Sequence, residues 1–254
     1  MGELAISGVS KYFRKGGNTF CALKATDMTI ETGQFISIIG PSGCGKSTLF
    51  NIIAGLLEPT TGNIQLDGQT IIGKSGCVGY MLQKDLLLPW RTILNNVILG
   101  LEIRGMSKKR ARQSALPLFE KYGLKGFENH FPSELSGGMR QRAALLRTLL
   151  HDQNLILLDE PFAALDAQTR LLMQTWLLKL WDDFKKTVLF VTHDIDEAIY
   201  LSDEIYVFSA RPGHLKERVH VPLERPRDEQ SLTGQTYLSL KTHLLESLKV
   251  EQHV

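Results

Sequence analysis

A glycine-rich segment carries the clearest chemistry in the chain. Residues Gly40 to Ser47 read Gly-Pro-Ser-Gly-Cys-Gly-Lys-Ser, which fits the pattern Gly-x-x-x-x-Gly-Lys-[Ser/Thr]. Glycines allow several backbone N–H groups to converge on one anion, and a helix that follows adds the positive end of its dipole. The segment therefore predicts a phosphate-binding loop, and a simple glycine-rich turn with an exposed lysine is the alternative.

The side chains of this loop suit a nucleotide that carries a metal ion. Lys46 offers a mobile positive charge for the β- and γ-phosphates, and the hydroxyl of Ser47 is a hard oxygen ligand for Mg²⁺. Cys44 lies among backbone amides near Lys46, which favours the thiolate and predicts a reactive cysteine. The expected nucleotide contacts form one continuous set: Gly40, Pro41, Ser42, Gly43, Cys44, Gly45, Lys46, Ser47 and Thr48.

Two carboxylates follow an apolar stretch later in the chain. Leu155–Leu158 predicts a buried strand, and Asp159 and Glu160 come directly after it. Carboxylates at the carboxyl end of a parallel strand face the crevice where ligands bind. Asp159 is expected to hold Mg²⁺ through water, and Glu160 to polarise the water that attacks the γ-phosphate. A solvated acidic pair at a helix start before Pro161 is the alternative.

A second helix start suited to an anion is predicted within Leu135 to Arg142. Ser136 stands where the N-cap is expected, and Gly137 and Gly138 follow it. The first turn of this helix therefore presents free N–H groups and a positive dipole end to a negatively charged ligand.

The elements that must position these groups alternate between strands and helices. Strand, loop and helix in this order indicate an α/β fold with a parallel sheet. The first thirty or so residues favour antiparallel strands instead, since polar and apolar residues alternate from Asp27 to Glu31. Buried strands are predicted at Phe35–Ile39, Val78–Leu82, Leu155–Leu158 and Val188–Val191, and helices at Lys46–Leu57 and Ala167–Phe184.

Helical patterns replace strand patterns between about Gln83 and Leu150. Helices are predicted at Ile93–Arg104 and Ser107–Tyr122, and Gly123 is a suitable C-cap for the second. Pro117 lies inside that helix, where an interior proline costs about 3 kcal/mol, so a kink or an early stop is expected there.

The composition excludes several classes of protein. The 254 residues are 43% hydrophobic and 22% charged, as in an average globular protein. The net charge of +2 gives no indication of a nucleic-acid-binding surface. The spacing of the three cysteines is typical neither of a disulfide framework nor of a zinc site. No export or lipid-anchor signal is visible, and no apolar run approaches the roughly 20 residues that cross a bilayer. We expect a soluble, cytoplasmic chain.

The order of the motifs resembles that of the nucleotide-binding subunits of ABC transporters. The match covers about residues 4–225, and its motifs are Gly40–Ser47, Gln83, Leu135–Gly138, Asp159–Glu160, Leu165–Asp166 and His193. The resemblance implies an α/β fold: a P-loop NTPase core with a mixed sheet, an N-terminal antiparallel β-subdomain and an inserted α-helical subdomain.

The resemblance also implies how the chain is divided. A single ABC ATPase domain would span residues 1–254, and its nucleotide-binding core would comprise 1–83 and 151–225. The helical signature subdomain would be 84–150. The remaining residues, 226–254, would form a helical tail, in agreement with the leucine spacing at Leu238, Leu244, Leu245 and Leu248.

Further site residues follow from the resemblance. Phe13 is similar to the aromatic residue that stacks on adenine, with Tyr12 as the second candidate. Gln83 is similar to the residue that links Mg²⁺ and the attacking water to the helical insert, and His193 to the switch histidine that contacts the γ-phosphate. Asp166 is similar to the residue that meets the opposing subunit, although a helix N-cap would explain it equally well.

Three sets of residues are thus implied. The catalytic set is Glu160, His193, Gln83 and Lys46. The metal ligands are Ser47, Gln83 and Asp159. The nucleotide contacts comprise the phosphate-binding loop together with Phe13, Ser136, Gly138 and Asp166.

The family works with partners. In the family, two ATPase subunits form a head-to-tail dimer. Each Mg²⁺-bound ATP lies between the motifs of one chain that correspond to Gly40–Ser47 and Asp159–Glu160 and the signature motif of the other, which corresponds to Leu135–Gly138. The segments Leu87–Ile93 and Glu160–Phe162 are similar to those of the subgroup that energises uptake of nitrate, taurine and aliphatic sulfonates. The implied protein is an importer subunit on the cytoplasmic face of the cell membrane, bound to a separate permease and served by a solute-binding protein.

Departures from the family pattern are few. Met139 stands where glutamine is common and Ala164 where serine is frequent, and neither change should abolish hydrolysis.

Two functions are alternatives to that of an importer subunit: a non-transport ABC ATPase and a nucleotide-dependent scaffold. A scaffold needs neither Glu160 nor His193, which argues against it. No nucleic-acid partner is expected, because the basic run Lys108–Arg112 lacks interleaved aromatic residues and fits a solvated helix face.

A strongly apolar segment, Leu86–Trp90, follows Gln83. Such a segment predicts either a docking surface for the permease or part of the core of the helical insert, with Leu87 and Trp90 filling that core.

Overall fold

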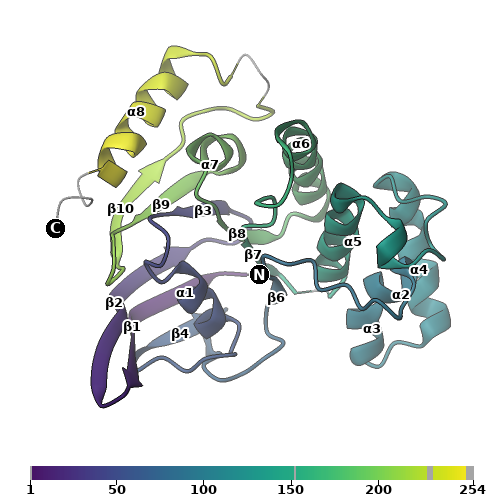
Figure 1. Ribbon diagram of the computed structural model, residues 1–254, viewed down its shortest axis with the longest axis horizontal. Coiled ribbons are helices and arrows are strands. Elements are labelled where there is room, and N and C mark those ends of the chain that lie inside the picture. The colour runs from purple at the N-terminus through teal and green to yellow at the C-terminus, as the bar shows by residue number, and fades with distance from the viewer. Residues whose placement is uncertain (1, 152, 228–230, 250–254) are drawn as a thin grey trace. The chain divides into compact units, whose positions relative to one another are not determined.

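The computed structural model describes residues 2–151, 153–227 and 231–249 (Figure 1). The chain folds into two compact units. Unit 1 takes in Met1–Val78 and Lys186–Val254, and unit 2 is Gly79–Lys185. Within the described ranges, no helix combines the length and the hydropathy that crossing a membrane requires.

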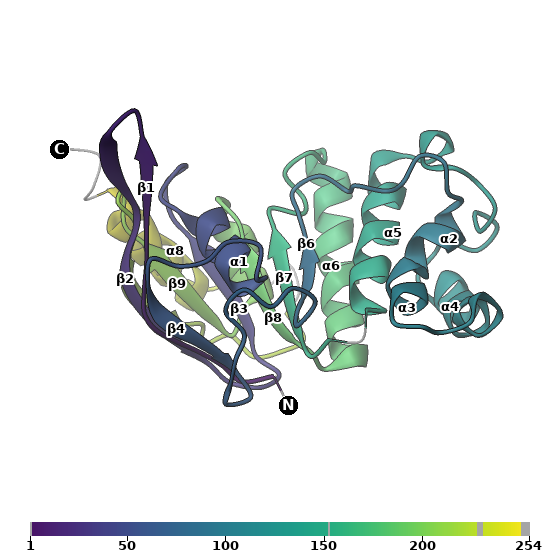
Figure 2. The same ribbon diagram turned by 90° about the horizontal axis from the view of Figure 1, so that it is seen from below.

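Unit 1 contains an antiparallel sheet with the strand order β2-β1-β4-β5, and Figure 2 labels the first three of these strands. Its strands are β1 (Leu4–Lys15), β2 (Asn18–Ile30), β4 (Thr61–Leu66) and β5 (Gln69–Thr70). In β2 the side chains of Thr26, Met28 and Ile30 are buried, whereas those between them are exposed. The alternation around Asp27 thus gives the half-buried strand that the sequence predicts.

Unit 1 also contributes four strands of a mixed sheet, in the order β10-β9-β3-β8. They are β3 (Phe35–Ile39), β8 (Thr187–Val191), β9 (Glu204–Phe208) and β10 (Leu215–His220). Strand β3 runs parallel to β8 and β9, while β10 is antiparallel to β9. All residues of β3 and β8 are buried, which is why these strands are mostly apolar and do not alternate between polar and apolar residues.

The helices of unit 1 are α1 (Lys46–Ile53), α7 (Ile195–Leu201) and α8 (Gln235–Lys249). Helix α1 ends four residues before the predicted Leu57. Its end is set by Gly55, which has φ 71° and whose added Cβ would lie 2.4 Å from the carbonyl oxygen of Lys74. The final helix is present in the predicted tail, of which residues 228–230 and 250–254 lie outside the described residues.

Unit 2 combines two parallel strands with helices. The strands are β6 (Gly79–Met81) and β7 (Leu155–Asp159). The helices are α2 (Ile93–Val97), α3 (Leu99–Ile103), α4 (Lys108–Lys121), α5 (Gly137–Leu149) and α6 (Ala167–Phe184), with a short 3₁₀ turn, η1, at Pro132–Glu134. Unit 2 therefore includes β6, β7 and α6 in addition to the helices of the predicted 84–150 insert.

Two details of the helical insert differ from the sequence-based expectation. The helix predicted at Ile93–Arg104 is divided into α2 and α3. Helix α4 continues through Pro117, so an early stop was wrong. Its buried face, formed by Ala111, Ala115 and Phe119, holds the helix together by packing, which offsets the hydrogen bond that the proline removes.

Candidate active site

The glycine-rich segment connects β3 to α1 in unit 1, as the phosphate-loop pattern requires. Gly43 and Gly45 have φ values of 77° and 109°, which glycine adopts readily. A Cβ on Gly45 would lie 2.6 Å from the carbonyl oxygen of Ala22, and one on Gly40 would lie 2.9 Å from Phe208. The loop is therefore shaped by close backbone contacts with β2 and β9 that a larger residue would break.

The positive charge of the loop is held close to it. Lys46 is only 6% exposed, and its Nζ donates hydrogen bonds to the carbonyl oxygens of Gly40 (2.7 Å) and Pro41 (3.1 Å). Helix α1, which begins at Lys46, has no side-chain N-cap bond and no acidic residue in its first turn. Its first N–H groups thus remain suited to an anionic ligand, as a phosphate cradle requires.

Cys44 does not fulfil its predicted reactivity. Its side chain is fully buried, and its Sγ lies 3.7 Å from Nζ of Lys46 and would contact a Cβ on Gly40. The thiol therefore points behind the loop, where reagents in solution cannot reach it. The expectation of a reactive cysteine was wrong because it assumed an accessible thiol, whereas the side chain of Cys44 is buried.

We expect a maleimide to modify Cys21 and Cys77, which are half-buried, well before Cys44. Mass spectrometry of the native protein, compared with protein labelled in denaturant, measures the order of reaction. Rapid native labelling of Cys44 would contradict the burial of its side chain.

His193 lies at the same sheet edge as the loop. It follows β8, which pairs with β3 in parallel, and the backbone N–H of Thr192 donates to the carbonyl oxygen of Ile38 (3.3 Å). The carboxyl ends of parallel neighbours meet at one edge, so Gly40 and His193 both leave the sheet there. The side chain of His193 is exposed at this edge.

The candidate adenine-binding residues lie in β1. Phe13 stacks on Phe20 of β2, with ring centroids 5.5 Å apart and ring planes at 27°. Tyr12 is exposed, and its hydrogen bond with Cys21 raises the pKa of its hydroxyl. Phe13 thus has a preformed aromatic environment, whereas its stacking on adenine stays a prediction.

Unit 2 brings together Asp159, Glu160 and Gln83. Asp159 ends β7 and is 7% exposed, with the hydroxyl of Tyr80 3.5 Å from its Oδ2. Burial and then the charge of Asp159 raise the pKa of Tyr80. Carboxylate oxygens are ligands that Mg²⁺ prefers, so Asp159 at the end of β7 fits the role of a Mg²⁺ ligand.

Glu160 has an unusual backbone. Its φ is 45°, in the left-handed region that non-glycine residues rarely adopt. Nε2 of Gln83 donates a hydrogen bond to Oε2 of Glu160 (3.3 Å). Strain of this kind clusters at functional sites, where it holds a side chain in a working position. The geometry is what a general base with a fixed orientation needs.

The signature residues start α5, as predicted. Ser136 is the N-cap, and its hydroxyl accepts a hydrogen bond from the N–H of Met139 (3.4 Å). Asp166 caps α6 in the same manner, accepting from the N–H of Thr169 (3.0 Å), and this bond lowers the pKa of its carboxyl. The N-cap expected for Asp166 is therefore confirmed, and its contact with an opposing subunit stays a prediction.

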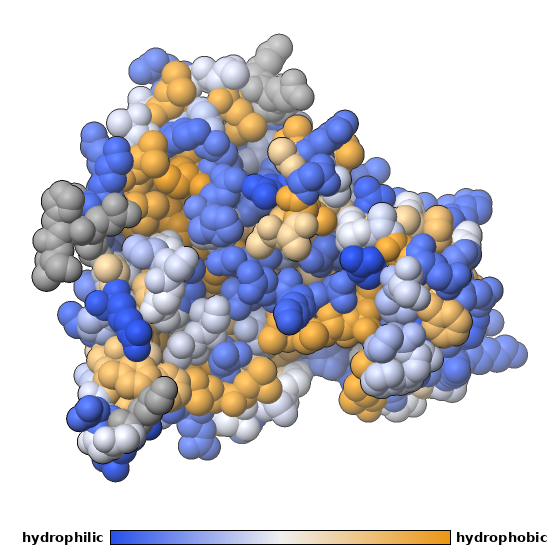
Figure 3. Space-filling view, viewed as in Figure 1, coloured by the Kyte–Doolittle hydropathy of each residue, from blue (hydrophilic) through white to orange (hydrophobic). Residues whose placement is uncertain are grey.

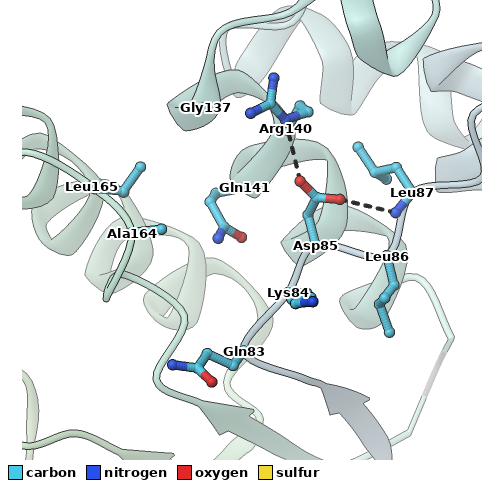
Figure 4. Close-up of a pocket in the computed structure, with 10 residues that line it drawn as sticks. All are labelled: Gln83, Lys84, Asp85, Leu86, Leu87, Gly137, Arg140, Gln141, Ala164 and Leu165. Atoms are coloured by element: carbon cyan, nitrogen blue, oxygen red, sulfur yellow. Dashed lines mark hydrogen bonds and ion pairs between the residues drawn. The ribbon is translucent and has the colours of Figure 1, made fainter.

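A pocket of about 440 Å³ lies beside these residues within unit 2 (Figure 4). Arg140 of α5 donates from Nε to Oδ2 of Asp85 (3.2 Å), and Arg147 donates to the carbonyl oxygens of Asp85 and Leu86. These hydrogen bonds hold Asp85 and Leu86, which follow Gln83, against the signature helix α5. Reasoning from the sequence missed this link and the role of Tyr80, because neither belongs to a short motif. The pocket is lined by Gln83, Lys84, Asp85, Leu86, Leu87, Gly137, Arg140, Gln141, Ala164 and Leu165.

Comparisons with known proteins agree with this arrangement. The family model of the ABC transporter matches residues 23–163. An uncharacterized ABC transporter ATP-binding protein of Methanocaldococcus jannaschii is 47% identical over 97% of this chain and 94% of its own length. The aliphatic sulfonates import ATP-binding protein of Bacillus thuringiensis is 42% identical over 97% of this chain and 96% of its own. The taurine import ATP-binding protein of Yersinia pestis is 48% identical over 78% of both chains.

The solved structures lead to the same family. A dimeric ATP-binding cassette in a post-hydrolysis state, bound to ADP and Pi, has a TM-score of 0.75 and 34% identity. The alignment of the two structures covers 86% of this chain and 98% of that cassette. The predicted fold, a P-loop NTPase core with a mixed sheet, an antiparallel β part and a helical insert, is confirmed. With its phosphate loop, its carboxylate pair at the end of β7 and its capped signature helix, the chain belongs to the ABC transporter family.

Proposed function

We propose that this ABC ATPase, which binds ATP with Mg²⁺ and hydrolyses it as a dimer, powers an importer for a small anion or organic solute of the sulfonate, taurine or nitrate type. The observation that carries the proposal is the similarity, along nearly the whole chain, to ATP-binding proteins named for aliphatic sulfonate import. The permease is a separate partner, and a solute-binding protein delivers the substrate. The chain is a single ABC ATPase domain that works at the cytoplasmic face of the cell membrane as a peripheral subunit.

The candidate site residues have distinct roles in binding ATP and Mg²⁺. Lys46 and backbone N–H groups within Gly40–Thr48 bind the phosphates, with Pro41, which has no N–H, shaping the loop, while Phe13 stacks on adenine. Ser47, Gln83 and Asp159 hold the metal, which when bound neutralises charge on the phosphates.

Glu160 accepts a proton from the attacking water, and the hydrogen bond that it accepts from Gln83 helps to orient its carboxylate. His193 contacts the γ-phosphate. Ser136 and Gly138 bind the nucleotide of the opposing subunit, and Asp166 contacts that subunit.

An uptake assay tests the solute class. The chain is reconstituted with the permease that copurifies with it and the matching binding protein, and uptake of taurine, an alkanesulfonate and nitrate is measured with and without ATP. We expect ATP-dependent uptake of at least one of these anions. ATP hydrolysis that responds only to a solute of another chemical class would contradict the proposal.

The segment Leu86–Trp90 supports a permease contact. Trp90 is 74% exposed, whereas Leu87 is buried, so the alternative of a core role holds for Leu87 alone. The segment is ordered by buried Asn96, whose Oδ1 accepts from the N–H of Leu88 (2.7 Å) and whose Nδ2 donates to three carbonyl oxygens. A large aromatic side chain held outward on a fixed turn is suited to act as an anchor.

We predict that Trp90→Ala leaves the ATPase activity of the isolated protein within a few-fold of the parent but reduces its recovery with permease-containing membranes and lowers uptake. Leu172→Ala, which removes another exposed apolar side chain, is the matched control and should keep both properties. Equal membrane recovery for the two variants would place the docking surface elsewhere.

A further inference from the structure

Helix α8 is built into unit 1 through α7. Figure 1 shows α8 beside α7 and above β9 and β10, and the space-filling view shows apolar side chains between α8 and the strands that it covers (Figure 3). Tyr237, Leu240 and Leu244 of α8 share one buried cluster with Ala198 and Ile199 of α7. A displacement of α8 must therefore disturb the packing of α7.

A polar link joins the same two helices at the first turn of α7. The hydroxyl of Tyr237 donates to Oδ1 of Asp196 (2.5 Å), and Nζ of Lys241 donates to Oδ2 (2.8 Å). Asp196 raises the pKa of both donors, that of Tyr237 to about 12 after the larger effect of burial. The side chain of Asp196 is 49% exposed and that of Lys241 35%, so this pair adds little to folding stability. Its directional bonds instead tie the first turn of α7 to α8.

The start of α7 is also what holds the backbone at His193. Asp194 is the N-cap and accepts from the N–H groups of Asp196 (2.9 Å) and Glu197 (3.2 Å). The hydroxyl of Thr192 accepts from the N–H of Asp194 (3.0 Å) and donates to Oε2 of Glu197 (2.5 Å). Both chain neighbours of His193 are thus bonded into the turn that carries Asp196.

We propose that α8 positions His193 for ATP hydrolysis through Asp196, with Tyr237 and Lys241 as positioning residues. The inference rests on the proposed contact of His193 with the γ-phosphate. A misplacement of about 1 Å at a group that stabilises a transition state is enough to slow turnover markedly. The helical tail is then part of the catalytic apparatus, and a ligand or partner that moved α8 would change the rate of hydrolysis.

A second set of contacts on α8 supplies the matched control. Ser247 donates from Oγ to Oε2 of Glu217 (2.9 Å), and Nζ of Lys216 donates to the carbonyl oxygen of Ser247 (2.6 Å). These bonds tie α8 to β10 and do not touch α7. Ser247→Ala therefore loosens α8 by one side-chain hydrogen bond, as Tyr237→Phe does, without altering the link to Asp196.

The test measures kcat and KM for ATP with the full-length protein. We expect Tyr237→Phe to lower kcat three- to tenfold with KM within twofold, because His193 acts in the transition state, and Ser247→Ala to retain both values. Lys241→Met should resemble Tyr237→Phe, and Lys241→Arg, which can still donate to Asp196, should restore kcat. Melting temperatures of all variants, measured in parallel, ensure that each assay is performed on folded protein.

A double-mutant cycle with His193→Ala completes the test. We expect Tyr237→Phe to cause no further loss in the His193→Ala background. An equal loss in both backgrounds, or equal kcat for Tyr237→Phe and Ser247→Ala, would overturn the positioning role while leaving the proposed function intact. Parental turnover of His193→Ala would instead refute the role proposed for His193, and the inference with it.

Discussion

Glu160→Gln is expected to reduce ATP hydrolysis by about 10²–10⁴-fold while ATP still binds. Loss of a general base has an effect of this size, which corresponds to roughly 3–5 kcal/mol of transition-state stabilisation. Glutamine preserves the size of the side chain and can still pair with Gln83, which now bonds Oε2 of Glu160 at 3.3 Å. Binding and chemistry are therefore separated by this single change. Because ATP is no longer converted to ADP and phosphate, an ATP-bound dimer should accumulate.

Steady-state phosphate release, nucleotide titration and light scattering measure the three parts of this result. Glu120→Gln is the control: it removes an exposed carboxylate of unit 2 that pairs with Lys125, and it should retain parental turnover. If Glu160→Gln hydrolysed ATP at the parental rate and stayed monomeric with ATP, Glu160 would not be the base, and the acceptor of the proton would have to be sought among other residues.

The sequence was informative wherever a local pattern determines structure. Strand β3, at Phe35–Ile39, and helix α6, at Ala167–Phe184, have the predicted bounds, because a mostly apolar run and an N-cap at Asp166 are local signals. Ser136 likewise caps α5 as its position predicts. The family motifs identified the candidate site for the same reason, since each motif is a short run of chain.

Features that depend on tertiary packing could not be read in this way. The fully buried Cys44 has Gly213, a residue distant in the sequence, as a close neighbour. The passage of α4 through Pro117 depends on its packed face, and no local rule gives the left-handed backbone of Glu160. Strand β9 and the bond between Asp196 and Tyr237 were missed as well, because the partners that define them come from separate parts of the chain.

Gly213 packs against the phosphate-binding loop at Cys44, and its replacement should lower the affinity for nucleotide. A Cβ at this position would lie 1.8 Å from the carbonyl oxygen of Cys44, a backbone atom that no side-chain rotation can move away. The turn itself is fixed, because the N–H of Lys24 donates to the carbonyl oxygen of Gly213 (2.8 Å). The added methyl group must therefore displace the peptide of Cys44 and, with it, the amides that bind phosphate.

We predict that Gly213→Ala weakens ATP binding by roughly 10- to 100-fold, since one lost hydrogen bond to a charged ligand costs about 1.5–3 kcal/mol. Calorimetric titration with ATP measures the affinity, and circular dichroism shows whether the fold persists. Gly234→Ala is the matched control: its Cβ would meet nothing within 4 Å, and the affinity should be parental. A folded Gly213→Ala protein with parental affinity would mean that the loop adapts to the methyl group, and that the close approach of Gly213 does not determine the shape of the phosphate site.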